Sequence, residues 1–234
     1  VRGFEPTEKQ FAAQLEQFQN ESVVRVFADI KKGGGQAAVK YGLEVAANEK
    51  LDVKRRQTAM AALEGHINRK DDAQIKALFD IAGNPKTPGE VLDQAFRRIK
   101  ELPRDKVIEQ LYGFFESSDW KLRRLAGATV LSMSEVKHID EFMDALAKRA
   151  TKNFNLPEAI TYGAYLGALK EGDPAAKLEP HMRSGPPQVR MSAISYFYDF
   201  GTKHELNKLD PFLNDGTKAP TCEEEAGCDW TCLI

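Results

Sequence analysis

The sequence predicts an all-α protein, a right-handed α–α superhelix (solenoid) of about five helical hairpins with an N-terminal capping hairpin and an irregular C-terminal tail. Three observations predict this fold. An amphipathic pattern with helical spacing recurs along the chain, turn-forming residues separate its copies, and no stretch of useful length alternates polar and apolar residues as a strand would.

The recurring pattern is an apolar residue, then basic or polar residues, then small and large apolar residues at helical spacing. Its copies are separated by 38, 31, 34 and 33 residues, which suits two helices and two turns per copy. Small residues recur near the middle of each copy, where they allow neighbouring helices to approach closely. The copies begin at Val53, Val91, Leu122, Leu156 and Val189, and their small residues are Ala61, Ala95, Ala126, Gly163 and Ala193.

A partner helix is predicted before each copy, so that each copy supplies the second helix of a hairpin. Gly83-Asn84-Pro85 and Ser184-Gly185-Pro186-Pro187 are typical of the turns between such helices, and Asp119 suits an N-cap. The predicted first helices are Gln36–Ala47, Asp72–Ile81, Arg104–Glu116, Val136–Ala150 and Pro174–Met182.

The two ends of the chain have different patterns. Residues 1–35 predict capping helices over Thr7–Phe18 and Glu21–Lys32, followed by three glycines. The repeat array is expected over 36–213, with Lys203–Leu213 as its last helix, and residues 214–234 are expected to be irregular. Polar ends of this kind would keep the stacking faces of a repeat array from exposure.

The copies from Leu122 and Val189 resemble HEAT repeats, in which an Asp-containing turn precedes Val-Arg and an Ala-rich second helix. The resemblance covers roughly residues 36–213 and implies a scaffold whose second helices line a concave face. It also implies a ladder of Asp and Arg side chains between neighbouring repeats, incomplete here because Asp93 and Glu158 break the pattern. The matching positions are Asp52, Asp119, Arg56, Arg123 and Arg190.

Composition excludes several classes of protein. Apolar residues make up 42% of the chain and charged residues 29%, which is typical of a globular protein. Lys and Arg number 33 against 35 Asp and Glu, and this lack of basic excess argues against a dedicated nucleic-acid binder. No apolar run is long enough for a membrane span.

All three cysteines, Cys222, Cys228 and Cys232, fall in the tail. Their clustering favours an oxidising, extracytoplasmic (periplasmic or secreted) compartment, with a disulfide in the tail and the third thiol unpaired or bonded to another molecule. The start at Val1 is compatible with a removed targeting segment. The alternative is a reduced cytosolic tail without a role. A zinc site would need a fourth ligand, and no His lies nearby.

The predicted partner-binding residues come from two kinds of side chain. Basic pairs recur on the second helices, at Arg55-Arg56, Arg97-Arg98 and Arg123-Arg124. They indicate either a positive stripe for an acidic peptide or a nucleic-acid backbone, or structural ladder arginines beside solvated helix faces. Tyrosines gather in the last copies, where they suit either a binding surface or partial burial. The candidates are Arg98, Arg124, Tyr162, Tyr165, Tyr196 and Tyr198.

One resemblance favours an enzymatic function as the alternative. Some HEAT-like proteins are alkylpurine DNA glycosylases, and Asp119-Trp120 with Arg123-Arg124 is superficially similar to their groove residues. The Asp expected one turn beyond the Trp is replaced by Arg124, and the four His do not converge with acids or thiols. The sequence therefore predicts no catalytic, metal or cofactor site. It predicts a protein–protein interaction scaffold or adaptor, a subunit of a larger assembly, with DNA binding or glycosylase activity as the alternative.

Overall fold

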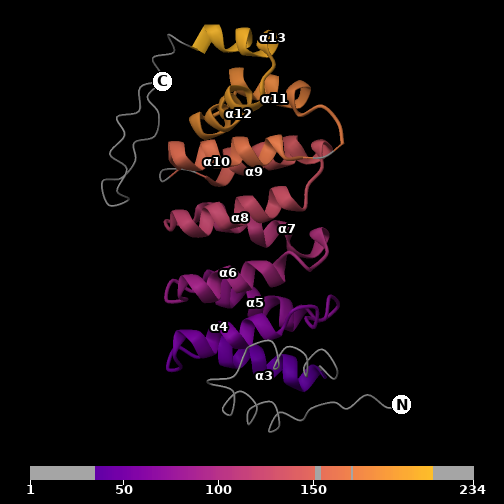
Figure 1. The fold of residues 1–234 in the computed structure, drawn as a ribbon, viewed down its shortest axis with the longest axis vertical. Coiled ribbons are helices and arrows are strands. Elements are labelled where there is room, and N and C mark those ends of the chain that lie inside the picture. Colours follow the sequence, from indigo (N-terminus) through magenta and orange to yellow (C-terminus); the bar gives the residue numbers. More distant parts are fainter. Residues whose placement is uncertain (1–34, 151–153, 170, 213–234) are drawn as a thin grey trace. The chain divides into compact units, whose positions relative to one another are not determined.

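The computed structural model describes residues 35–150, 154–169 and 171–212, and within these ranges the protein is helical without a strand (Figure 1). The predicted all-α class is therefore confirmed for this part of the chain. The predicted capping helices Thr7–Phe18 and Glu21–Lys32, and the tail with its three cysteines, lie outside the described residues.

Every helix predicted between residues 36 and 200 is present, and each begins within three residues of its predicted start. Short 3₁₀ segments extend α7 and precede α9. The first helices are α3 (Gln36–Ala47), α5 (Asp72–Gly83), α7 (Arg104–Gly113), α9 (Ile139–Arg149) and α11 (Pro174–Arg183). The second helices are α4 (Val53–Ala62), α6 (Gly89–Ile99), α8 (Trp120–Ser132), α10 (Leu156–Gly167) and α12 (Pro187–Phe200).

Side-chain caps explain many of these starting points. The carboxylates of Asp52, Asp71, Asp119 and Asp173 each accept a hydrogen bond from a backbone N–H in the first turn of the following helix. Asn155 and Glu158 form a capping box at the start of α10. Because such caps satisfy N–H groups that the helix itself leaves unpaired, the turn residues visible in the sequence define the helix starts.

The predicted single helix Lys203–Leu213 is wrong in detail. The structure has a short α13 (Lys203–Leu206) that continues as a 3₁₀ helix over Asn207–Phe212, and Leu213 is not described. Pro211 lies within this segment, lacks an N–H group, and disfavours α conformation in the residue before it.

The chain divides into two compact units, Val1–Val107 and Ile108–Ile234, with the boundary inside α7. Within the first unit, α3 contacts α5 and α4 contacts α6, so that first helices pack on first helices and second on second. Within the second unit, α8 contacts α10, α10 contacts α12, and α9 contacts α11.

Several polar contacts between helix pairs join residues 35–37 positions apart in the sequence. In the first unit, Arg98 bonds to Ala61, 37 residues away, and Asn84 bonds to Glu49, 35 residues away. In the second unit, Arg123 bonds to Glu158 across 35 residues, and Lys177 to Asp140 across 37. This spacing is close to the period that the sequence pattern predicts.

The core of the second unit surrounds Tyr162, a fully buried side chain on α10. Phe115, Phe142 and Phe154 have ring centroids 5.5–6.2 Å from the Tyr162 ring. Glycines permit the close approach of the second helices here. A Cβ on Gly127 would lie 2.3 Å from the Tyr162 ring, so the ring occupies the space that a larger residue would need.

Candidate partner-binding groove

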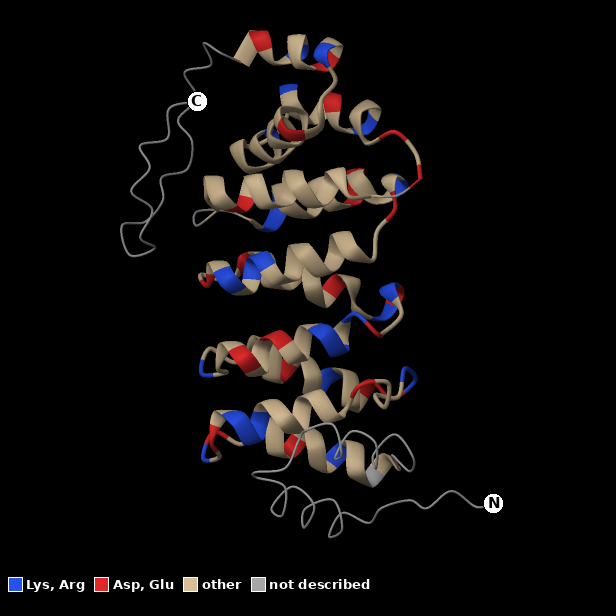
Figure 2. Ribbon diagram, in the orientation of Figure 1, with Lys and Arg blue, Asp and Glu red and all other residues tan. Residues whose placement is uncertain are grey.

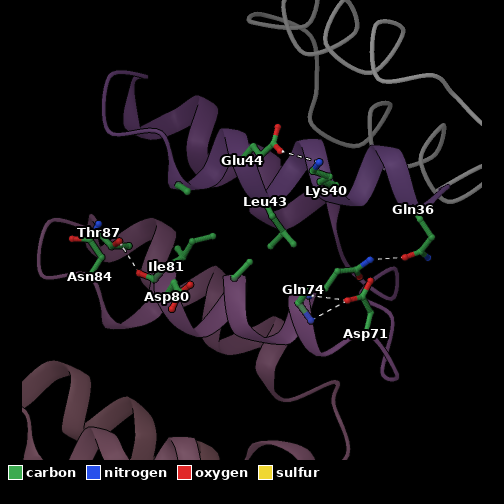
Figure 3. Close-up of a pocket in the computed structure, with 13 residues that line it drawn as sticks. Gln36, Lys40, Leu43, Glu44, Asp71, Gln74, Asp80, Ile81, Asn84 and Thr87 are labelled. Carbon is green, nitrogen blue, oxygen red and sulfur yellow. Dashed lines mark hydrogen bonds and ion pairs between the residues drawn. The ribbon is translucent and has the colours of Figure 1, made fainter.

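A groove of about 670 Å³ lies between α3 and α5 in the first unit (Figure 3). Its floor is apolar, and Leu43 and Ile81 point into the space between the two helices. Both of these side chains are almost fully buried, whereas Ala73 is exposed and Ala77 is half-buried. The small alanine side chains leave the floor of the groove open along α5.

The rim of the groove is charged. Lys40 and Glu44 lie on α3, with the Lys40 ammonium 3.9 Å from the Glu44 carboxylate. Asp80 lies on α5, where Lys76 pairs with its carboxylate at 2.6 Å. Asp71 caps α5 through one oxygen, which accepts from the N–H groups of Ala73 and Gln74 at 3.0 and 3.1 Å. Among the described lining residues, Lys40 is the only cation against three carboxylates.

Polar bridges span both ends of the groove. At one end the Gln74 amide donates to the Gln36 carbonyl oxygen, as a dashed line in Figure 3 marks. At the other, Asn84 donates to Glu49 at 3.0 Å, and this bond lowers the pKa of the Glu49 carboxyl. The open length of the groove is therefore set by α3 and α5, each of 12 residues.

Helical periodicity creates the groove-lining stripe on α3. Val39, Leu43 and Ala46 are buried, while Lys40 and Glu44, one turn apart, are exposed. Sequence reasoning missed this groove because it placed binding on the second helices. The spaced polar residues of α3, opposite the two alanines of α5, are the signal that could have indicated it.

A smaller cleft of about 330 Å³ lies between the second helices α4 and α6. Gln57 and Gln94 line it, both half-buried, together with Glu64, the exposed Arg97 and the buried Arg98. This cleft is polar, unlike the α3–α5 groove. It is the part of the first unit where the sequence predicted partner binding.

Arg98 is 5% exposed, which makes it a structural residue of the first unit. Its guanidinium donates to the Ala61 carbonyl oxygen at 2.9 Å and pairs with Glu101 at 3.0 Å. Burial lowers its pKa, against the raising effect of Glu101. Arg98 thus joins α6 to α4 and offers little surface to a partner.

Of the remaining predicted residues, three are exposed. Arg124 is exposed and lies over the Trp120 ring, 5.1 Å from its centroid. Tyr165 is 40% exposed and Tyr198 is 76% exposed. Their role in binding stays a prediction.

The other two tyrosines belong to the core of the second unit. Tyr162 is fully buried, and its hydroxyl donates to the Arg123 carbonyl oxygen at 2.8 Å. Burial raises the pKa of Tyr162 well above its usual value. Tyr196 is buried as well, and its ring stacks on Phe200 at 5.8 Å. The partial burial that the sequence allowed for the tyrosines therefore describes these two better than partner contact.

Arg123 and Glu158 form a buried ion pair between α8 and α10. Two nitrogens of Arg123 reach the two carboxylate oxygens of Glu158 at 2.9 and 2.5 Å, and both side chains are at most 3% exposed. Arg123 also donates to the carbonyl oxygens of Ser117 and Ser118. Burial raises the pKa of the Glu158 carboxyl, against lowering by Arg123 and by the backbone N–H of Asn155.

The residues that the HEAT resemblance singled out have local roles. Asp52 and Asp119 cap α4 and α8. Arg56 donates to the carbonyl oxygen of Ala46 at 2.8 Å, and Arg190 to that of Met182 at 3.3 Å. In these two pairs, therefore, the arginine ties the second helix to the end of the first helix before it.

The basic pairs do not form a continuous positive stripe within either unit. Arg56, Arg98 and Arg123 are buried, and each bonds to a carbonyl oxygen. Figure 2 shows both signs of charge interspersed along the helices. Of the residues that suggested a glycosylase, Asp119 caps α8 and Arg123 forms a buried ion pair with Glu158.

Searches of protein-family models, curated proteins and solved structures found no match to this chain. Within the described ranges, no three His, Cys, Asp or Glu side chains are grouped as metal ligands would be. Nor does any described helix combine the length and apolar character needed to cross a membrane.

Proposed function

We propose that this protein is a non-catalytic scaffold or adaptor that holds a protein partner as a subunit of a larger assembly. The α3–α5 groove carries this proposal. Its floor is apolar and its charged groups lie at the rim, which is the arrangement of a protein–protein contact with a desolvated centre and a polar edge. Its volume of about 670 Å³ is large enough to receive several side chains of a partner.

We further propose that the helix pairs form a HEAT-like α-solenoid. The packing of first helices on first and second on second within each unit supports it, as does the recurrence of polar contacts across 35–37 residues. A stacked array would present long surfaces made from successive helices, which suits a scaffold. The α4–α6 cleft and the cysteine-bearing tail are further contact elements in this proposal.

Affinity capture from the source cells tests the proposed function, with the wild-type chain compared with Ala77→Arg. The substitution puts a long charged side chain on the groove floor. Ala147→Arg is the matched control, since Ala147 is also a half-buried alanine on a first helix, but in the second unit. We expect a protein retained by the wild type and the control and lost with Ala77→Arg. Equal retention by all three chains, or none by any, contradicts the proposed role of the groove.

A further inference from the structure

We propose that the α3–α5 groove binds a single amphipathic helix of the partner, about three turns long, with small apolar side chains on the floor and Lys or Arg side chains over the rim. This inference rests on the proposed function and specifies the chemistry of the partner. Three features of the groove carry it: the shape of the floor, the length between the end bridges and the charge of the rim.

The shape of the floor favours a helix with a narrow apolar face. Ala73 and Ala77 are one turn apart on α5 and leave the backbone of that helix approachable. Leu43 and Ile81 are almost fully buried at the bottom of the groove, so its accessible apolar surface comes mainly from Ala47, Ala73 and Ala77. Small residues at such a surface allow a third helix to pack closely against both.

The length of the groove fixes the length of the ligand. The Gln36–Gln74 bridge lies at one end and the Asn84–Glu49 bridge at the other. Between them run the 12 residues of α3 and the 12 of α5. At 1.5 Å per residue this is about 18 Å, the length of a helix of about three turns. An extended peptide of that length would have only about five or six residues, and its backbone groups would meet an apolar floor without hydrogen-bond partners.

The charge of the rim determines which charge we expect on the side chains of the ligand. Glu44, Asp71 and Asp80 face the groove against Lys40. Lys76 pairs with Asp80 from outside the groove, and Lys40 approaches Glu44 no closer than 3.9 Å. The second carboxylate oxygen of Asp71 has no hydrogen bond from a described residue. This acidic rim complements Lys or Arg side chains beside the apolar face of a helix.

The test is a titration of the full-length chain with three labelled peptides, followed by fluorescence anisotropy. One peptide is an Ala/Leu amphipathic helix of about 12 residues with Lys on its polar face, and the second has Glu in place of Lys. The third is the chain's own segment Thr7–Phe18, whose sequence has apolar residues at helical spacing and two glutamates. We expect the Lys peptide to bind about tenfold more tightly than the Glu peptide, with the difference decreasing as salt is added.

Charge reversal at the rim provides the decisive comparison. The double variant Glu44→Lys/Asp80→Lys should weaken the Lys peptide about tenfold and strengthen the Glu peptide, because the sign of the rim changes. Glu116→Lys/Asp144→Lys is the matched control, since it replaces two exposed carboxylates in the second unit with the same change in net charge, and it should change neither affinity. Circular dichroism checks that each variant keeps its helical content.

Several outcomes overturn the inference. These are equal binding of the Lys and Glu peptides, no effect of the double variant, or tightest binding of the Thr7–Phe18 peptide, which would make the groove a site for the chain's own N-terminal segment. Self-association in sedimentation equilibrium that Ala77→Arg abolishes would make a second copy the occupant. In the first two cases, a partner that is captured by the wild type and lost with Ala77→Arg would still support the proposed function. Failure of this inference can therefore be distinguished from failure of the proposed function.

Discussion

Arg123 and Glu158 show at the residue scale how this chain uses charge in its interior. Both side chains are removed from water, and their two parallel contacts join α8 to α10. Such a pair adds little net stability over an apolar pair of the same size, but the loss of one member leaves a buried charge without a partner. We therefore expect the pair to contribute to the specificity of the α8–α10 contact more than to its stability.

We predict that Arg123→Met lowers the free energy of unfolding by about 3–5 kcal/mol, because it leaves the Glu158 carboxylate buried and unpaired. The double variant Arg123→Met/Glu158→Leu should recover most of this loss, since no charge is left behind. Urea denaturation at neutral pH measures both. A double variant as unstable as the single one would show that the cost comes from packing rather than from the unpaired charge.

The same variant should depend on pH in a defined direction. Burial already raises the pKa of Glu158, and removal of Arg123 takes away a group that lowers it. With a folded-state pKa above the unfolded one, the folded state binds more protons between the two values, so stability is lost as pH rises. We expect the gap between Arg123→Met and wild type to be smallest near pH 4, about the unfolded pKa of a Glu, and larger at pH 7.

The control for this pH dependence is Arg123→Met/Glu158→Gln, which has no carboxyl at the site. Its stability relative to wild type should lack the extra loss between about pH 4 and pH 7. If the single variant and this control show the same pH profile, Glu158 is not the group responsible.

At the scale of elements, α10 and α12 pack unusually closely through a glycine. A Cβ on Gly163 would lie 2.7 Å from both the Ser195 Cβ and the Tyr196 backbone nitrogen. Since a backbone atom is part of this contact, the neighbouring helix would have to move. The small residue that the sequence pattern placed at Gly163 is therefore explained by the helix contact.

We predict that Gly163→Ala lowers the free energy of unfolding by about 1–3 kcal/mol, although alanine is the better helix former by about 1 kcal/mol. Gly89→Ala is the matched control, because Gly89 begins α6 and a Cβ there would meet no atom within 4 Å. It should be neutral or slightly stabilising. Thermal denaturation of both variants measures the difference, and a Gly163→Ala protein as stable as wild type would contradict the close crossing.

The helices were predictable from the sequence and the site was not, for related physical reasons. Caps and apolar periodicity are local, so Asp52, Asp71 and Asn155 indicate helix starts without knowledge of the tertiary fold. Whether a polar residue faces solvent depends on what packs against it. Arg98 and Tyr162 have polar side chains, yet both are buried and bond to carbonyl oxygens on neighbouring helices.

The groove escaped prediction because alanines form part of its floor. Ala73 and Ala77 resemble ordinary helix-forming residues, and only their position opposite α3 gives them a role. Pro211, in contrast, was visible in the sequence, and its effect on the last helix follows from its missing N–H group.

At the scale of the whole molecule, the tail differs from the rest of the chain because it contains every cysteine. All three lie between residues 222 and 232, outside the described residues. We predict that thiol titration of the denatured, unreduced protein gives fewer than three thiols, because a disulfide forms in the tail or to another molecule. Non-reducing electrophoresis distinguishes these two cases. Three titratable thiols would contradict both.

The α3–α5 groove is proposed to hold a protein partner. Photo-crosslinking in the source cells tests this most directly, with a photoreactive residue at Lys40 on the groove rim and, as a control, at Lys148 on α9. Both are exposed lysines on first helices. We predict one discrete crosslinked protein from Lys40 that Lys148 does not give. The same products from both positions, or no protein adduct from Lys40, would contradict the claim.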